Sequence, residues 1–108
     1  MSKRYTFFIH MNATKEWTSL TEAERNSYFT ETLKGIFLTY PSVLVRLYDA
    51  EAFSAKCTDI AVCETEILED YNLLVEDLRN SEMFSVPYFE VVDVFPTIED
   101  DFKSITSE

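Results

Sequence analysis

Glycine is almost absent from this sequence, since Gly35 is the single one in 108 residues. Gly-rich loops that hold phosphates, and the fingerprint of dinucleotide-binding folds, need several glycines at fixed spacing. A G-x-S-x-G turn, which presents the nucleophile of many serine hydrolases, needs two. The sequence therefore excludes these nucleotide-binding and hydrolase motifs.

Side chains that bind metals are also scarce. His10 is the only histidine, and the two cysteines, Cys57 and Cys63, are six residues apart. This is not the C-x-x-C spacing of zinc or redox sites, and on one continuous strand the two thiols would lie about 20 Å apart, beyond disulfide reach. We therefore expect no metal site, no cofactor such as haem, and two free thiols, which favour a reducing, cytoplasmic location.

Positive charge is in short supply as well. Nine Lys and Arg face twenty Asp and Glu, for a net charge of −11. A nucleic-acid-binding surface must neutralise phosphates, and an anionic membrane attracts basic segments, so we expect neither partner. No apolar run approaches 18 residues, which argues against a membrane-spanning helix. The basic and then apolar start is interrupted by His10 and Asn12, so we interpret it as a strand and not as a signal peptide.

Large hydrophobic side chains are abundant. The hydrophobic fraction is 46%, with nine Phe and six Tyr. This is enough for one folded core, and we expect a single domain over residues 1–108, in which 97–108 form an acidic C-terminal tail.

Periodicity predicts the order strand–helix–strand–strand–helix–strand. Alternation favours strands at 5–12, 43–49, 58–65 and 88–95, and apolar residues at three-and-four spacing favour helices at 21–40 and 66–80. Thr21 and Glu24 form a capping-box pattern at the first helix, and Thr65 is the expected cap of the second. Pro41 and Pro96 are expected to end the first helix and the last strand. Phe53 is the expected packing anchor of the connection over 50–57.

This order is that of the ferredoxin-like α+β fold, a four-stranded antiparallel sheet with two helices on one face. The other face would be left uncovered, although apolar residues are expected on it. They are Phe8, Leu44, Ala61, Val92 and Val94. Because an exposed apolar sheet face favours burial against a second copy, we expect a homodimer of the dimeric α+β barrel type.

The same uncovered face is expected to carry polar residues around a cavity. They are His10, Asn12, Arg46, Tyr48, Asp59, Cys63, Tyr88 and Glu90. His10 is a candidate general acid or base, Arg46 a candidate anion holder and Tyr48 a candidate hydrogen-bond donor, and the others are candidate ligand contacts. The alternative is structural: Arg46 pairs with Asp59 or Glu90 in an interface, and His10 is only hydrogen-bonded.

Three segments resemble the darcynin family of small bacterial proteins. They are YTFFIHMNATKEW, LYDAEAFSAKCTDIAVCETE and VPYFEVVDVFPTIEDDF, which together span most of the chain. The resemblance implies no reaction and transfers no catalytic residue, and the likeness to dimeric α+β barrels is one of fold.

Two functions follow as hypotheses. In the first, a homodimer binds or transforms a small anionic or aromatic molecule in a cavity on the open sheet face, without a metal or organic cofactor. In the second, the protein is a non-catalytic structural or interaction dimer whose polar sheet face only forms the interface.

Overall fold

The computed structural model describes residues 3–100. Most of the tail expected over 97–108 lies outside this range, and Thr97 and Ile98 belong to the last strand. The elements in chain order are β1 (Tyr5–Ala13), α1 (Lys15–Thr18), α2 (Glu22–Tyr28), the π-helical segment η1 (Phe29–Leu33), α3 (Lys34–Thr39), β2 (Leu44–Asp49), β3 (Asp59–Thr65), α4 (Leu68–Arg79), α5 (Glu82–Ser85) and β4 (Phe89–Ile98).

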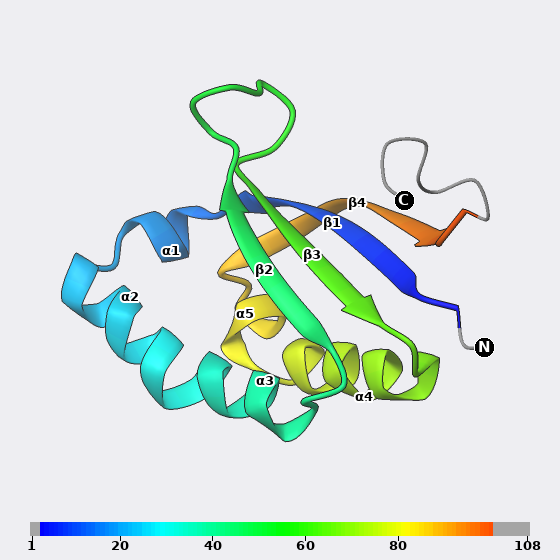
Figure 1. Cartoon of the computed structure of the whole chain (residues 1–108). Coiled ribbons are helices and arrows are strands. Elements are labelled where there is room, and N and C mark those ends of the chain that lie inside the picture. Colours follow the sequence, from blue (N-terminus) through cyan, green and yellow to red (C-terminus); the bar gives the residue numbers. More distant parts are fainter. Residues whose placement is uncertain (1–2, 101–108) are drawn as a thin grey trace.

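The four strands form one antiparallel sheet in the order β2-β3-β1-β4. The helices lie together on one side of this sheet, and the other side is uncovered (Figure 1). The expected ferredoxin-like α+β fold is therefore confirmed. β1 and β3 are the central strands, so they carry most of the buried side chains of the sheet, whereas β2 and β4 form its edges.

The first long helix begins as the sequence predicts. The side chain of Thr21 accepts a hydrogen bond from the backbone of Glu24, and the Glu24 carboxylate accepts one from the backbone of Thr21. The helix is not uniform, because η1 inserts a wider π turn between α2 and α3. It ends at Thr39, before Pro41.

Two local expectations about caps and ends are wrong. α4 begins at Leu68 with Ile67 as its N-cap residue, and Thr65 instead accepts a hydrogen bond from the Ile67 backbone at 2.9 Å. β4 continues through Pro96 to Ile98. A proline is tolerated there because β4 is an edge strand, which pairs with a neighbour on one side only.

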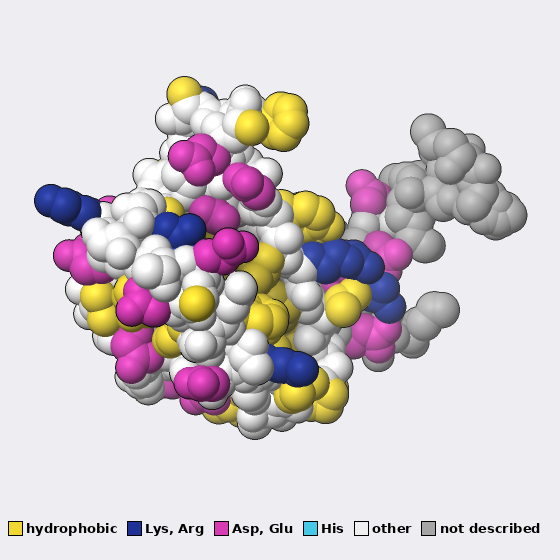
Figure 2. Space-filling model, turned by 90° about the vertical axis from the view of Figure 1, so that its left-hand side faces the viewer, with side chains coloured by type: hydrophobic (Ala, Val, Ile, Leu, Met, Phe, Trp, Pro, Cys, Tyr) yellow, Lys and Arg dark blue, Asp and Glu magenta, His cyan; other side chains and the backbone are white. Residues whose placement is uncertain are grey.

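The connection between β2 and β3 is a loop that projects from the top of the molecule (Figure 1). Its turn is local, since the carbonyl of Ala50 accepts hydrogen bonds from the backbones of Phe53 and Ser54. Phe53 is 91% exposed, so the expectation that it anchors this segment by packing is wrong. The tip of the loop extends beyond the sheet, so Phe53 does not reach the described core, whereas Cys57 at the end of the connection is buried. Figure 2 shows hydrophobic side chains at the tip.

The core lies between the helices and the sheet. Its centre is Leu74 of α4, which is fully buried, and Met11 of β1, which is 2% exposed. The other buried members are Phe7, Ile9, Leu33, Val43, Ala61, Cys63, Leu78, Met83 and Phe89.

Candidate functional site

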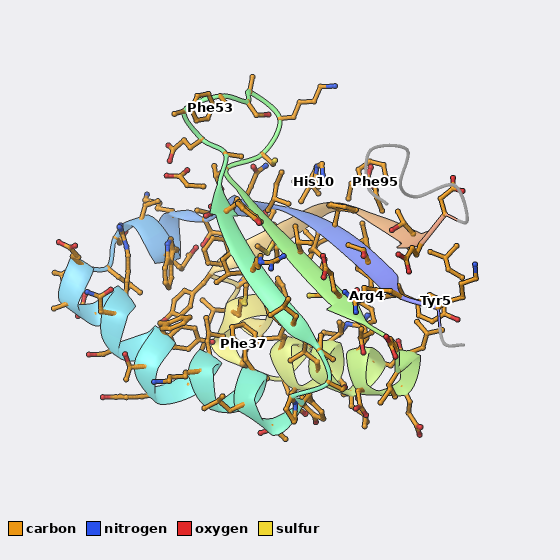
Figure 3. All side chains as sticks on the ribbon, in the orientation of Figure 1. Arg4, Tyr5, His10, Phe37, Phe53 and Phe95 are labelled. Carbon is orange, nitrogen blue, oxygen red and sulfur yellow. The ribbon has the colours of Figure 1, made fainter. Side chains whose placement is uncertain are left out.

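The open face of the sheet carries His10, Asn12, Arg46 and Tyr48, as the sequence predicts. Cross-strand neighbours point to the same side of a sheet, and His10 is opposite Ile60, Tyr48 is opposite Ile60, and Arg46 is opposite Val62. Figure 3 shows His10 and Phe95 on the same side of β1 and β4, away from the helices. Asn12 continues the His10 set along β1.

The register separates these residues into rows across the sheet. The rows are Tyr48–Ile60–His10–Asp93, then Arg46–Val62–Phe8–Phe95, then Leu44–Glu64–Thr6–Thr97. Neighbouring strands are about 4.8 Å apart, so residues separated by one strand lie roughly 10 Å apart. His10 and Tyr48 have Ile60 between them, and Arg46 is in the next row. One protomer therefore places the three candidate catalytic residues on one face without bringing them into contact.

Arg46 has a different partner from either of those expected. Its guanidinium lies 3.8 Å from the carboxylate of Glu64, which also lies 3.9 Å from Arg4. The side chains of Arg4 and Arg46 are each 54% exposed, so these are long surface ion pairs that contribute little stability on their own. His10 lies edge-on to the ring of Phe95, with centroids 5.0 Å apart.

Asp59 and Cys63 lie on the opposite face, so this part of the prediction is wrong. Cys63 is opposite Phe7, Asp59 is opposite Met11, and all but Asp59 are buried against the helices. Burial raises the pKa of the Cys63 thiol to about 11. On β3, Ile60 and Val62 are as apolar as Ala61 and Cys63, so alternation alone does not show which set faces the helices. The register decides the face, since Cys63 lies opposite the buried Phe7 and Ala61 lies opposite the buried Ile9.

Two apolar residues that the sequence assigned to the open face, Val94 and Ala61, lie on the helix side instead. Val94 of β4 is opposite Ile9 and faces the helices, and Ala61 does the same on β3, whereas Phe95 takes a place on the open face. The register of β1 against β4 shifts between His10 and Met11, and such a bulge reverses the parity that the sequence pattern assumes. The bulge leaves Val92 without a partner in the ladder.

Tyr88 and Glu90 lie near the start of β4. Tyr88 precedes the strand and packs among aromatic rings, 5.3 Å from Trp17 and 5.1 Å from Tyr28 between centroids. It is therefore part of the helix-side packing and not of the open face. Glu90 is opposite Asn12 and so keeps the open face that the sequence assigned to it, and at the edge of the sheet it also borders the cavity described next.

A cavity that the sequence did not predict opens between α4 and β4, on the helix side of the sheet. Its volume is about 920 Å³. Within the described residues α4 packs mainly over β3, and the main helix contact of β4 is with the short α5, so the space between α4 and β4 is not filled. Val91 and Val94, which face the helix layer from β4, are consequently 48% and 36% exposed. Much of the lining is apolar or aromatic, including Phe7, Ile9, Val75, Leu78, Phe84, Phe89 and Pro96.

Polar groups enter this cavity from α4. They are Tyr71, Asn72, Glu76 and Arg79. Tyr71 stacks on Phe7 with ring centroids 3.7 Å apart, and burial, with a smaller effect of Cys63, raises the pKa of its phenol to about 12. Arg79 lies in the last turn of α4 and makes no ion pair with any residue from 3 to 100. The spacing of apolar residues in the sequence predicts the helix, but it does not show that part of the apolar face of α4 is left uncovered by the sheet.

The described part of the chain shows neither a membrane span nor a metal cluster. Within residues 3–100, no helix is long and apolar enough to cross a membrane, and no three His, Cys, Asp or Glu side chains lie close enough together to hold a metal ion. Cys57 and Cys63 are both buried and unbonded to one another.

Comparison with known sequences identifies the family. The family model named Darcynin, a domain of unknown function, matches residues 2–106. The chain belongs to the darcynin family. Darcynin 1 of Acinetobacter baumannii is 48% identical over 89 residues, covering 82% of this chain and 99% of that protein. Darcynin of Chromobacterium violaceum is 43% identical over 76 residues, covering 70% of this chain and 96% of that one.

Solved structures share the fold at low sequence identity. A mutant chlorite dismutase from Candidatus Nitrospira defluvii superposes with a TM-score of 0.75 at 15% identity, over 94% of this darcynin and 42% of that chain. A novel heme-binding protein from Thermus thermophilus superposes with a TM-score of 0.77 at 19% identity, over 93% and 42%. This darcynin thus spans about two fifths of each of these chains, and the likeness is one of fold.

Proposed function

We propose that this darcynin binds a small, mostly apolar molecule with an anionic group in the α4–β4 cavity, and that two copies pair through their open sheet faces. The observation that carries the first part is the cavity itself. Its volume of about 920 Å³ lies within the range of small-molecule sites, which combine apolar walls with a few polar groups.

Arg79 sets the charge that we assign to the ligand. Its guanidinium has no ion pair among residues 3–100 and borders a mostly apolar cavity, in which Glu76 and Glu90 are the acidic groups. Such a guanidinium attracts a carboxylate, sulfonate or phosphate, and its planar donors can hold two oxygens. The Tyr71 phenol stays protonated up to a pKa of about 12, so it is a hydrogen-bond donor at neutral pH.

Haem does not fit the residues of this cavity, although one structural neighbour is described as a heme-binding protein. Among residues 3–100, the lining contains no His, Cys or Met that could serve as an axial ligand. A tyrosine binds haem iron as the phenolate, which the raised pKa of Tyr71 opposes. His10 lies on the opposite face of the sheet. We therefore propose a ligand that needs no iron ligation.

The open sheet face supports pairing with a second copy. Its hydrophobic side chains Phe8, Leu44 and Phe95 are 37%, 47% and 47% exposed, and Phe8 lies between the half-buried Val62 and Phe95. The face also carries both signs of charge, with Arg46 near Glu64 and His10 opposite Asp93. A two-fold contact presents the same patch twice, so such a mixed surface can complement itself. A cytoplasmic location is part of this proposal and is supported by the two unbonded thiols.

In this proposal His10, Arg46 and Tyr48 belong to the dimer interface. This is the structural role that the sequence supports as the alternative to catalysis. Their separation by Ile60 and Val62 supports this role. A catalytic role would require the second copy to bring groups from both sheets together, and a substrate to span them.

Ligand binding is tested by a thermal-shift screen of anionic aromatic metabolites, because a ligand that binds only the folded state raises its melting temperature. Val75→Trp fills the cavity and should abolish the shifts. Leu38→Trp, at a position on α3 that is 68% exposed, is the matched control and should keep them. Shifts that survive Val75→Trp would contradict the assignment of the cavity.

Pairing is tested by sedimentation equilibrium. Phe8→Glu places a charge at the centre of the open face and should convert a dimer to a monomer. Phe53→Glu, in the exposed loop, should leave the dimer intact. If the unmodified protein is a monomer at micromolar concentration, the dimer is refuted. The cavity assignment is tested separately by the thermal-shift screen.

A further inference from the structure

We propose that a second cavity, between the α2–η1 segment and the end of the sheet formed by β2 and β3, binds a small zwitterion with an apolar side chain. Asp59 would receive its ammonium group and Arg25 its carboxylate. The cavity has a volume of about 400 Å³, and its lining shares only Phe89 with that of the α4–β4 cavity.

Asp59 offers a carboxylate that lacks a positive partner. One of its oxygens accepts a hydrogen bond from the Thr58 hydroxyl at 2.7 Å, and no ion pair reaches it from residues 3–100. Asp49 is directly opposite on β2, so two like charges face one another across the strands. Burial, with a smaller contribution from Asp49, raises the pKa of Asp59. A bound ammonium group would relieve both costs.

Arg25 offers a guanidinium that also lacks an ion pair within the described chain. It is held in place by backbone groups, because Nε donates to the carbonyl of Trp17 at 3.2 Å and a terminal nitrogen donates to that of Thr18 at 3.1 Å. Its guanidinium carbon lies 5.7 Å from the centre of the Trp17 ring. A guanidinium has five N–H donors, so donors remain for a carboxylate.

Arg25 and Asp59 line the same cavity but do not pair with each other, which makes a ligand with both charges the best match. A simple anion would face Asp59 and Glu22, and Figure 2 shows further acidic side chains scattered over this side of the molecule. A simple cation would leave Arg25 unpaired. The remaining walls include Met11, Phe29, Leu33, Leu47 and Met83, so the rest of the ligand is apolar.

The backbone beside the cavity supports a binding role. Phe29 and Leu33 bound the π-helical segment η1, and both line the cavity. A π turn is a costly insertion in an α-helix and occurs often at functional sites. Because a π turn contains an extra residue, it rotates the side chains of α3 relative to those of α2. The cavity lies beside this segment.

The proposal is tested by isothermal titration at neutral pH with L-leucine, L-methionine and L-phenylalanine. At least one of these amino acids should bind. For phenylalanine, the analogues that carry a single charge are 3-phenylpropionate and 2-phenylethylamine, and each should bind about tenfold or more weakly than the amino acid. If leucine or methionine is the ligand, its own deaminated and decarboxylated analogues are compared in the same way. Absence of binding by all three amino acids at millimolar concentration would overturn the proposal.

Two variants assign the charges. Asp59→Asn should remove the preference for the amino acid over its deaminated analogue, and Arg25→Gln should remove the preference over the decarboxylated one. Because Arg25 also joins α1 to α2, Arg25→Lys is a second variant that keeps the charge and should retain part of the preference. Glu31→Gln, exposed in η1 and absent from the lining, is the control and should bind as the unmodified protein does.

The test is independent of the first cavity. Val75→Trp should leave amino-acid binding unchanged, since Val75 lines only the α4–β4 cavity. Amino-acid binding that is lost in Val75→Trp but kept in both Asp59→Asn and Arg25→Gln would overturn the assignment to this second cavity.

Discussion

Phe7 of β1 lies directly opposite Cys63 of β3, and both side chains are buried on the helix side of the sheet. Tyr71 of α4 stacks on the Phe7 ring, with ring planes only 6° apart. This contact fixes which face of β3 is covered, and thereby leaves Ile60 and Val62 on the open face. It also holds α4 over the centre of the sheet, so that β4 is left partly uncovered and the larger cavity forms.

Leu74→Ala should destabilise the protein by about 2–5 kcal/mol, because it leaves a cavity at a fully buried position of α4. Urea unfolding measures the change. Leu38→Ala on α3, where the side chain is 68% exposed, should cost far less. Equal costs for the two variants would mean that α4 is not packed as the structure shows.

Thr21→Ala should lower the stability by about 0.5–2 kcal/mol, since it removes the side-chain oxygen that caps α2. Thr30→Ala, at an exposed position within η1, is the control. If chemical unfolding shows no difference between the two, the capping box contributes nothing to the folded state.

Cys63 should resist modification while the protein is folded. Its thiol is 2% exposed and its pKa is about 11, so only about one molecule in a thousand carries the thiolate at about pH 8. In a Cys57→Ser variant, a disulfide reagent should react slowly with the native protein and quickly after guanidinium is added. Rapid reaction of the native variant would place Cys63 nearer the surface.

Asp59→Asn should stabilise the protein at neutral pH. The folded state raises the pKa of Asp59 above its ordinary value of 3.8, so it holds the proton more tightly than the unfolded state does. Stability therefore falls as the pH rises from the ordinary value through the raised one. The variant escapes this loss, and its advantage should shrink when the pH is lowered below the ordinary value.

Thermal unfolding at several pH values, with Glu51→Gln in the exposed loop as control, measures this effect. A constant difference between Asp59→Asn and the unmodified protein at all pH values would show that ionisation of Asp59 is not its cause.

The sequence predicts the fold because its signals are local and strong. Thr21 and Glu24 mark the start of the first helix, and Phe7, Ile9 and Met11 form an apolar set whose alternate positions include His10 and Asn12, so the direction of β1 is unambiguous. The faces of β2 follow in the same way from Arg46 and Tyr48.

The site is harder to predict because it depends on contacts between distant residues. On β3, Ile60 and Val62 are as apolar as Ala61 and Cys63, so only the register against Phe7 decides the face. On β4, the shift between His10 and Met11 reverses the parity, which moves Val94 to the helix side. The two cavities arise where the helices leave space beside the sheet, and the periodicity of a sequence does not predict such gaps.

Amide chemical-shift mapping shows whether the α4–β4 cavity is the binding site. The isotope-labelled protein is titrated with 1-anilinonaphthalene-8-sulfonate, an apolar anion. We predict shifts concentrated over Tyr71–Arg79 of α4 and Phe89–Phe95 of β4, and their loss in Val75→Trp. Shifts confined to open-face residues such as Phe8 and Arg46, or no shifts at millimolar probe, would contradict binding in the α4–β4 cavity.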